Sequence, residues 1–231
     1  MTAPSRPPSV DKLARSLNSS GLPHPICVDV ARAAIEAGDP DSAARRADEF
    51  RRTLLTPVVN ATGVLLHTNL GRAPLAHHQD ASAQTVEFNL DTGQRGSRQA
   101  AGGQLYARLC GAEAAMVVNN NAAAVLLVVA ALAAGKDVPV SRGESVEIGG
   151  SFRVPEVIEQ SGARLVDVGT TNRTRLRDYE AAITRANVDA AMVLKVHPSN
   201  YRVEGFVEET SIADLATLDV PVVADIGSGL I

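Results

Sequence analysis

The chain reads Ala-Ala-Met-Val-Val-Asn-Asn-Asn-Ala-Ala-Ala at residues 114–124, and this stretch decides the fold. The short apolar run at residues 116–118 is typical of a buried strand, and the run of Ala, Val and Leu at residues 122–134 predicts a buried helix. The asparagines between them are preferred N-cap residues. A helix that starts here offers unpaired N–H groups and a positive dipole end to a phosphate. Ordinary helix caps have the same sequence, so the junction alone leaves both interpretations open.

The composition is that of a soluble globular protein. Hydrophobic residues make up 45% of the 231 residues and charged residues 21%, which lies in the range of such proteins. The formal net charge of −4 does not indicate nucleic-acid binding. No apolar run reaches membrane-spanning length, and residues 1–8 lack the apolar core of a signal peptide. We therefore expect a cytoplasmic protein with no membrane partner.

The cysteines and histidines do not indicate a metal site. Cys27 and Cys110 lie far apart in the sequence, and two cysteines without further ligands cannot form a zinc site. We expect both to be small buried side chains. The five histidines show no spacing such as H-x-x-x-H. The sequence therefore predicts no metal.

Periodicity divides the chain into a small helical domain, residues 1–56, and a larger domain, residues 57–231. The expected N-terminal helices span residues 11–17, 25–37 and 41–55, and one short helix at 75–86 interrupts an otherwise irregular segment. From residue 102 onward we expect helices at 102–110, 120–134, 154–161, 176–185 and 211–218, and strands at 114–118, 137–141, 164–168, 189–195 and 221–224. This alternation predicts an α/β domain with a mostly parallel sheet and helices on both faces.

Polar residues follow every expected strand. In an open parallel sheet, ligands bind at the carboxyl ends of the strands. The residues at these ends are Asn119, Asn120 and Asn121; Arg142, Gly143 and Glu144; Gly169, Thr170, Thr171, Asn172 and Arg173; His197, Ser199 and Asn200; and Asp225. Five polar strand ends favour a ligand site over the polar loops of a structural protein.

Two cofactor classes compete for such a site. A dinucleotide needs G-x-G-x-x-G between strand and helix, and the strand at 114–118 is followed by asparagines instead. Pyridoxal phosphate is the better match, because its phosphate binds a helix N-terminus and its pyridine nitrogen pairs with a carboxylate. Asp225, at the end of the apolar run 220–224, is the candidate carboxylate, and Asn200 is a candidate donor to the phenolic oxygen of the ring. Both residue types are also common in turns, which the sequence leaves open.

Several segments together resemble one family. They are Asn-Ala-Thr-Gly-Val-Leu-Leu-His-Thr-Asn-Leu-Gly-Arg at 60–72, Thr-Gly-Gln-Arg-Gly-Ser-Arg at 92–98, Val-Asn-Asn-Asn-Ala-Ala-Ala at 118–124, Ser-Arg-Gly-Glu at 141–144, Glu-Ile-Gly-Gly-Ser-Phe-Arg at 147–153, Val-Gly-Thr-Thr-Asn-Arg at 168–173 and Lys-Val-His-Pro-Ser-Asn-Tyr at 195–201. Over nearly its whole length the chain resembles an amino-terminal portion of bacterial L-seryl-tRNA(Sec) selenium transferase, or selenocysteine synthase. The resemblance implies the large domain of a fold-type I PLP-transferase, preceded by a small helical domain of tRNA-binding type.

The resemblance also implies an activity and a set of roles. The family converts seryl-tRNA(Sec) to selenocysteinyl-tRNA(Sec), with selenophosphate as selenium donor and pyridoxal 5′-phosphate as cofactor. By position, Asn119, Asn120 and Asn121 would hold the cofactor phosphate, Asp225 would pair with the pyridine nitrogen, and His197 and Asn200 would line the ring. Anion-handling residues would be Arg72, Arg95, Arg98, Thr170 and Thr171. The family further implies a homo-oligomer built as a ring of dimers, and tRNA phosphate contacts by the arginines at residues 45–52.

The chain departs from the family pattern in one respect. The family's Schiff-base lysine lies a few dozen residues beyond the strand that carries Asp225, and only six residues follow Asp225 here. Lys195 is a poor substitute, because the family has a lysine there with a different role. We therefore expect a domain truncated before the catalytic lysine and the C-terminal domain, which binds the cofactor non-covalently at best and is inactive alone. The alternatives are a non-catalytic tRNA-binding or assembly remnant and a different pyridoxal phosphate lyase.

Overall fold

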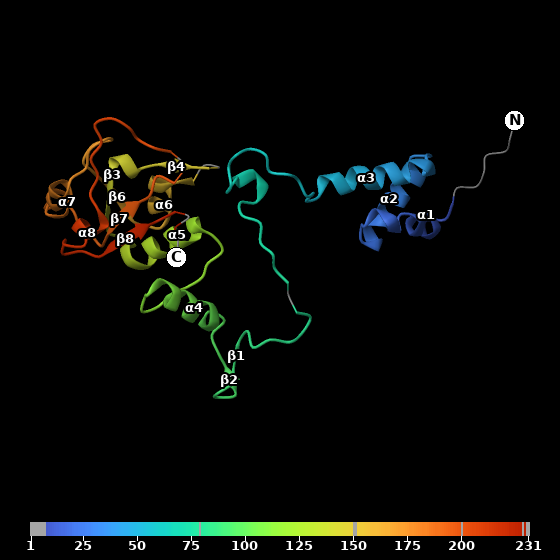
Figure 1. Ribbon diagram of the computed structural model, residues 1–231, viewed down its shortest axis with the longest axis horizontal. Coiled ribbons are helices and arrows are strands. Elements are labelled where there is room, and N and C mark those ends of the chain that lie inside the picture. The colour runs from blue at the N-terminus through green and yellow to red at the C-terminus, as the bar shows by residue number, and fades with distance from the viewer. Residues whose placement is uncertain (1–7, 79, 150–151, 200, 228, 230–231) are drawn as a thin grey trace. The chain divides into compact units, whose positions relative to one another are not determined.

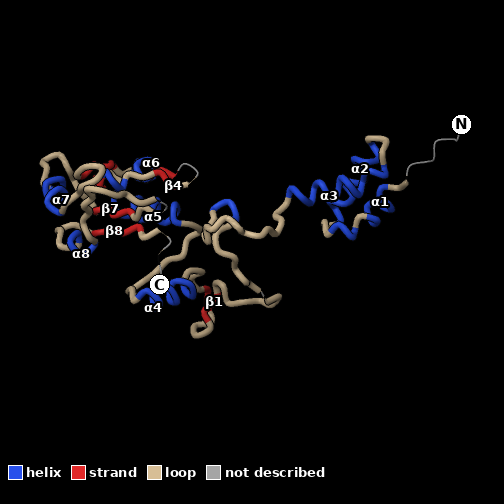
Figure 2. Tube along the Cα trace, turned by 45° about the horizontal axis from the view of Figure 1, so that its top comes forward, coloured by secondary structure: helices blue, strands red, loops and turns tan. Residues whose placement is uncertain are grey.

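The computed structural model describes residues 8–78, 80–149, 152–199, 201–227 and 229 (Figure 1). The chain divides into two compact units, Met1–Ala76 and His77–Ile231. Helices dominate the first unit, and the second unit mixes helices and strands (Figure 2). Among the helices of the described residues, none is both long enough and apolar enough to span a membrane. The expected domain boundary at residue 56 stays a prediction.

The α-helices in the described part of the first unit are α1 (Val10–Ser16), α2 (His24–Glu36) and α3 (Ala43–Thr53). They confirm the three helical segments expected from periodicity, although the last of these begins with a 3-10 turn at Pro40–Ser42. The core between the helices consists mainly of small side chains: Ala14, Leu17, Leu22, Cys27, Ala31, Ala34, Ala43 and Ala47. Small side chains let the helix axes approach closely, and Cys27 is buried as expected.

The second unit begins with a hairpin and a helix. Strand β1 (Phe88–Asn89) pairs antiparallel with β2 (Gln94–Arg95), and α4 (Ala100–Cys110) follows. The prediction of a helix at 75–86 is wrong, because the described residues of this range form turns and irregular backbone. Its apolar residues Leu75 and Val86 are exposed, so no packed face stabilises a helix there.

Two further predictions about this region are wrong. Residues 114–118 are not assigned as a strand. Instead the side-chain amide of Gln99 takes the place of a neighbouring strand. Its Nε2 donates to the carbonyl of Val117 at 3.1 Å, and its Oε1 accepts from the Val117 N–H at 3.2 Å. Cys110, expected to be buried, is exposed at the end of α4.

Two parallel strand pairs form the sheet of the second unit. Strand β3 (Asp137–Ser141) pairs with β6 (Arg164–Val168), and β7 (Val193–Val196) pairs with β8 (Val222–Asp225). Within the described residues, one parallel bridge, between Asp137 and Ala190, joins the two pairs. The spatial order is therefore β6-β3-β7-β8. The antiparallel pair β4 (Glu147–Ile148) and β5 (Phe152–Arg153) follows β3 in the chain.

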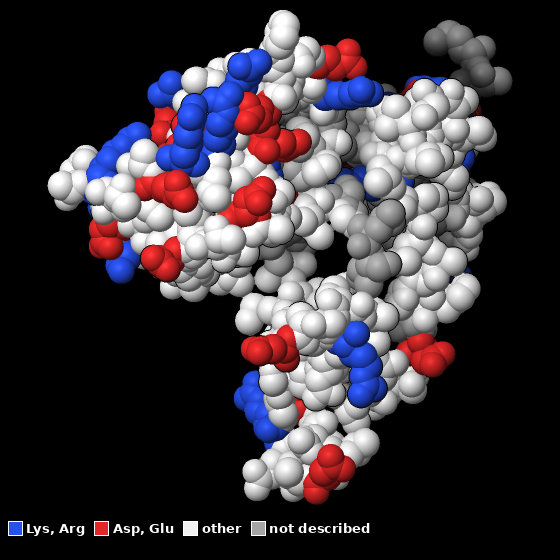
Figure 3. Space-filling view, turned by 60° about the vertical axis from the view of Figure 1, so that its left-hand side comes forward, with Lys and Arg blue, Asp and Glu red and all other residues white. Residues whose placement is uncertain are grey.

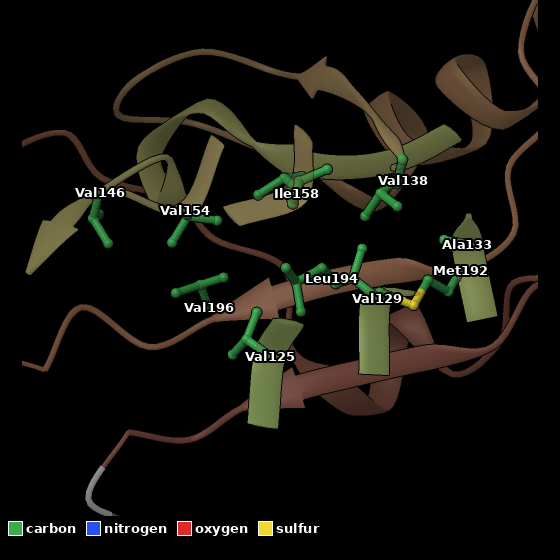
Figure 4. Packing of buried hydrophobic residues seen from close by; sticks show 12 residues of the cluster. Val125, Val129, Ala133, Val138, Val146, Val154, Ile158, Met192, Leu194 and Val196 are labelled. Atoms are coloured by element: carbon green, nitrogen blue, oxygen red, sulfur yellow. The ribbon is translucent and has the colours of Figure 1, made fainter. Parts of the chain in front are cut away.

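Helices cover both faces of this sheet. On one face, α5 (Asn121–Ala133) and α6 (Val154–Gln160) enclose a core that includes Leu194 and Val196 (Figure 4). On the other face, α7 (Leu176–Ile183) and α8 (Ile212–Leu215) pack with Val168 and Val193. Along β7, Val193 belongs to the second core and Leu194 and Val196 belong to the first, as the alternation of side chains along a strand requires. The predicted parallel α/β arrangement with helices on both faces is confirmed.

Asp137 forms hydrogen bonds across the junction between the two strand pairs. Its Oδ1 accepts from Arg164 Nε at 2.8 Å, and its Oδ2 accepts from the Asp189 N–H at 2.7 Å. Its backbone N–H donates to the Asp189 carbonyl, and its carbonyl accepts from the Ala191 N–H. The side chain is only 5% exposed. The hydrogen bond from Arg164 holds the pKa of the Asp137 carboxyl below its ordinary value, against the opposing effect of burial.

We predict that Asp137→Ala lowers the free energy of unfolding by about 2 kcal/mol, because it leaves the Asp189 N–H without its acceptor and removes the ion pair with Arg164. The control is Asp219→Ala at an exposed position, for which we expect a change within about 0.5 kcal/mol. Urea denaturation followed by circular dichroism measures both. A folded-state pKa below 3.8 means that the stabilisation is present above pH 3.8 and is lost as the pH falls through the lowered pKa. Equal stabilities of Asp137→Ala and wild type at neutral pH would contradict the assignment.

Candidate functional site

The start of α5 presents backbone N–H groups at the carboxyl-end edge of the sheet. Asn120 is the N-cap in extended conformation, and its Oδ1 accepts from the Ala123 N–H at 2.8 Å. The Asn120 carbonyl accepts from the Ala124 N–H, which begins the helical ladder. The helix has no carbonyl for the amides of Asn121 and Ala122, because first-turn N–H groups precede the ladder. These two amides, with the positive end of the helix dipole, can hold an anion.

A carboxylate lies directly beside this helix start. Asn121 Nδ2 donates to both carboxylate oxygens of Asp225, at 3.0 Å each. Asp225 ends strand β8 and is half-buried, and its Oδ1 also accepts from the Gly227 N–H at 2.9 Å. The structure therefore brings together two of the residues that the strand-end pattern singled out, although they are 104 positions apart in the sequence.

The end of β7 lies next to Asp225. The His197 N–H donates to the Asp225 carbonyl at 2.9 Å, and His197 Nδ1 accepts from the Ser199 N–H at 3.0 Å. In the neutral imidazole Nε2 therefore carries the hydrogen. His197 is exposed, as is Asn119, which immediately precedes the N-cap. Asn200 lies outside the described residues.

A small cavity of about 100 Å³ lies between α5 and the strands β7 and β8. Asn121 and Asp225 form its polar rim. Its remaining lining is aliphatic: Ala124, Val125, Val128, Val129, Leu194, Val223 and Ala224. An apolar floor with an amide and a carboxylate at the rim suits the flat ring of a small molecule that carries a polar atom at one edge.

A larger cavity, of about 330 Å³, lies at the ends of β3, β6 and β7 and contains neither Asn121 nor Asp225. Three carboxylates, Glu144, Glu208 and Glu209, line it together with Arg173 and Arg202. Lys195 pairs with Glu144 and Glu209, and Arg175 pairs with Glu208, so these carboxylates are already engaged with cations. This cavity lacks both the start of α5 and the Asp225 carboxylate. The smaller cavity beside α5 is therefore the better candidate for an anionic cofactor.

The family model of SelA, described as L-seryl-tRNA selenium transferase, matches residues 58–231. The chain belongs to this family. Curated relatives named L-seryl-tRNA(Sec) selenium transferase come from Moorella thermoacetica, 51% identical over 208 residues, and Solidesulfovibrio magneticus, 47% identical over 231 residues. These alignments cover 84% and 95% of this chain and 44% and 47% of the relatives. The chain thus spans about half the length of the curated relatives it matches.

Two more distant comparisons extend this picture. The L-seryl-tRNA(Sec) selenium transferase of Geobacter sulfurreducens is 45% identical over 262 residues, which covers 99% of this chain and 56% of the relative. The solved structure of D-glucosaminate-6-phosphate ammonia-lyase is similar with a TM-score of 0.47 and 26% identity, over 55% of this chain and 38% of that one. That structural similarity is too weak to support a conclusion about this SelA-family chain.

The arginines expected to handle anions in this SelA-family chain have different surroundings. Arg95 Nη2 and Arg98 Nη2 share the Glu87 carboxylate, at 3.1 and 2.7 Å, and both arginine side chains are largely exposed. Arg72 belongs to the first unit, where it adopts a positive φ of 61° and its N–H donates to the His67 carbonyl. The two threonines lie after β6: Thr170 Oγ1 donates to the Arg173 carbonyl, and Thr171 lines the larger cavity. Their roles in anion binding stay predictions.

The lysine nearest the site is already held by two carboxylates. Lys195 Nζ donates to Glu144 Oε1 at 2.6 Å and to Glu209 Oε2 at 3.1 Å. The other oxygen of Glu144 accepts from the Val196 N–H at 2.9 Å. The Lys195 and Glu144 side chains are 13% and 10% exposed. In this SelA-family chain, Lys195 therefore joins the loop after β3 to the end of β7.

Ionisation of this pair follows from burial and hydrogen bonding. Burial would lower the pKa of the Lys195 ammonium, but the hydrogen bonds to Glu144 and Glu209 outweigh it, and the pKa lies above the ordinary 10.5. Burial raises the pKa of the Glu144 carboxyl above its ordinary 4.5, against the opposing hydrogen bonds from Lys195 and Val196. The two ordinary values lie so far apart that the pair is charged at neutral pH. Lys195 is therefore a poor nucleophile.

Sequence reasoning named Glu144 among the polar strand ends but did not anticipate its pairing with Lys195, and it missed Glu87 and Glu209. Glu87 and Glu209 carry no local sign, because their partners lie 8 to 14 positions away across turns. On the face shown in Figure 3, acidic side chains lie next to basic ones.

We predict that Lys195 reacts more slowly than Lys136 with an amine-acylating reagent at pH 8, because its raised pKa lowers the neutral, reactive fraction of the amine and its side chain is only 13% exposed. Lys136 is the internal control, because its side chain is 51% exposed. Mass spectrometry of the digested chain measures both rates. Glu144→Gln should accelerate labelling of Lys195 and leave Lys136 unchanged. Equal labelling of the two lysines in wild type would show that the ammonium is not held as described.

Proposed function

We propose that this chain is part of an enzyme that converts seryl-tRNA(Sec) to selenocysteinyl-tRNA(Sec) with selenophosphate, in the cytoplasm, and that it carries the binding edge for pyridoxal 5′-phosphate. The observation that carries the proposal is the contact between Asn121 and Asp225, which sets a carboxylate beside a helix N-terminus. Membership of the SelA family and the names of its relatives support the activity. A dinucleotide enzyme would need a glycine-rich turn before α5, where the chain has asparagines.

The residues present match the chemistry of this cofactor. Its phosphate needs N–H donors, which the amides of Asn121 and Ala122 supply. Its pyridine nitrogen needs a carboxylate, and Asp225 lies at the same rim. The aliphatic lining of the small cavity suits an aromatic ring. When bound, pyridoxal phosphate acts as an electron sink for chemistry at the α-carbon of an amino acid.

Each remaining residue has a proposed task in this scheme. His197 borders the ring, because its backbone is tied to Asp225, and Asn200 donates to the phenolic oxygen. Backbone amides, more than asparagine side chains, hold the phosphate, because the Asn120 oxygen already caps the helix. The candidates for selenophosphate and the tRNA end are Arg72, Arg95, Arg98, Thr170 and Thr171. Lys195 does not bind the cofactor covalently, because Glu144 and Glu209 hold its ammonium.

The first unit is the proposed tRNA-binding part. Arg45, Arg46, Arg51 and Arg52 lie on α3, and the last two occupy its final turn. Arg45 pairs with Glu49 and Arg46 donates to Ser42, so these two are partly engaged within the helix. Arginine guanidinium groups at exposed positions are the usual contacts to nucleic-acid phosphates. A remnant that only binds tRNA is not favoured, since the relatives are named as transferases.

Exposed apolar side chains support assembly into a homo-oligomer. In the second unit Leu105 and Leu109 on α4, Met116, and Leu127 and Leu132 on α5 are 44–64% exposed. Exposed apolar side chains of this kind are candidate contacts between subunits. A ring of dimers, as in the family, is the proposed assembly.

We predict saturable, non-covalent binding of pyridoxal 5′-phosphate to the purified chain, measured by equilibrium dialysis. Asp225→Ala should weaken binding at least about tenfold, because a charge-assisted hydrogen bond contributes about 1.5–3 kcal/mol. Asp219→Ala, at an exposed position shortly before β8, is the control and should bind as wild type does. Absence of saturable binding to wild type, or an equal affinity of wild type and Asp225→Ala for pyridoxal 5′-phosphate, would refute the cofactor assignment.

The tRNA assignment needs a separate measurement. We expect the chain to bind seryl-tRNA(Sec) in a gel-shift assay more tightly than seryl-tRNA(Ser), and replacement of Arg51 and Arg52 by alanine to weaken that binding several-fold. The matched control replaces Arg15 and Arg32, which pair with Asp11 and Asp29 on α1 and α2. Equal affinity for both tRNAs would count against the proposed substrate.

A further inference from the structure

The side chain of Asn121 is committed to Asp225. One amide nitrogen lies 3.0 Å from both carboxylate oxygens, so it sits symmetrically in front of the carboxylate. The Gly227 N–H, in the loop after β8, donates to one of these oxygens at 2.9 Å. Two donors from different elements fix the rotation of a carboxylate about its last bond, which a single donor would leave free.

The position of Asn121 on α5 explains why this asparagine makes the contact. Asn121, Val125 and Val129 follow one another at intervals of four residues, so they share one face of the helix. Val125 and Val129 are buried against the sheet together with Leu194 (Figure 4). Asn121 is therefore the polar end of the face that α5 turns to β7 and β8. Asn120, one position earlier, points elsewhere and caps the helix.

We propose that Asn121 is a positioning residue, which holds the Asp225 carboxylate in the orientation that a pyridine nitrogen requires, and that it does not bind the cofactor phosphate through its side chain. This inference rests on the proposed function and refines it. An amide suits the task because it donates hydrogen bonds without a net charge and does not ionise. A lysine or arginine at this position would instead neutralise the carboxylate that the ring nitrogen needs.

The two possible roles of Asn121 predict different ligand dependences. If the Asn121 side chain binds the cofactor phosphate, it strengthens binding of pyridoxal 5′-phosphate only. Binding of pyridoxal, which lacks the phosphate, is then unaffected. A positioning residue acts on the ring nitrogen through Asp225, so it affects both ligands equally. Its effect also disappears when Asp225 is removed, because residues that act through one another are not additive.

The experiment is a double-mutant cycle on the full chain with Asn121→Ala, Asp225→Ala and both together. Equilibrium dialysis gives the dissociation constants of pyridoxal 5′-phosphate and of pyridoxal. We expect Asn121→Ala to weaken both ligands by a similar factor, about fivefold to tenfold for the loss of one hydrogen bond to a charged group. In the Asp225→Ala background, the same substitution should change neither constant more than about twofold.

Asn121→Asp distinguishes positioning from a merely structural role. A carboxylate in the first turn of α5 interacts favourably with the positive end of the helix dipole, so the helix content should not fall. The same carboxylate repels Asp225, so both ligands should bind more weakly than to Asn121→Ala. Circular dichroism and dialysis on the same samples separate the two effects.

The outcomes are distinct. A loss confined to pyridoxal 5′-phosphate, or a loss that persists undiminished in the Asp225→Ala background, overturns the positioning role and leaves the proposed function standing. Binding to Asn121→Asp as tight as to wild type also overturns it. Absence of saturable binding of pyridoxal 5′-phosphate to wild type overturns the proposed function and this inference together.

Discussion

The architecture of the second unit depends on the junction between β3 and β7. Each of these strands has a regular parallel partner, but between them the backbone of the described residues forms a single bridge, at Asp137 and Ala190. Two buried carboxylates span the junction, Asp137 at its start and Glu144 at its end. Asp137 thus accepts a hydrogen bond from the Asp189 N–H, and Glu144 accepts one from the Val196 N–H. Between regularly paired strands, backbone carbonyls would accept such hydrogen bonds. Without this junction the two strand pairs would not share a common carboxyl edge, and that edge is where the candidate site lies.

Two neighbouring asparagines at this common edge make different contacts. The side chain of Asn120 caps α5 by accepting from the Ala123 N–H, whereas the side chain of Asn121 donates to the Asp225 carboxylate. Helix geometry makes this division, because a step of one residue rotates a side chain by about 100° around the axis. Burial of Val125 and Val129 fixes the rotation of the whole helix, and so decides which asparagine faces the sheet. Packing in the core is therefore what orients the polar groups at the rim.

Sequence periodicity located most of the fold because the segments concerned satisfy their own hydrogen bonds or bury an apolar face. Strands β3 and β6 and helix α5 lie within a residue or so of the expected bounds. The prediction of a strand at 114–118 failed for the opposite reason. The apolar run is typical of a strand, but a strand needs a neighbouring strand for its hydrogen bonds. Here the side chain of Gln99 supplies the hydrogen bonds to Val117 instead. The convergence of Asn121 and Asp225 could be anticipated from strand ends alone. The pairings of Glu87 with Arg95 and Arg98, and of Glu209 with Lys195, could not be anticipated, since they depend on loop paths.

The N-terminal helices have a further property that follows from their alanine-rich interior. Alanine and cysteine side chains bring helices close together but remove little hydrocarbon area from water for each residue ordered. The heat capacity increment of unfolding scales with that area, so this bundle should melt over a broad temperature interval with a small calorimetric enthalpy. A small enthalpy in turn makes the balance between the folded and unfolded bundle change only slowly with temperature.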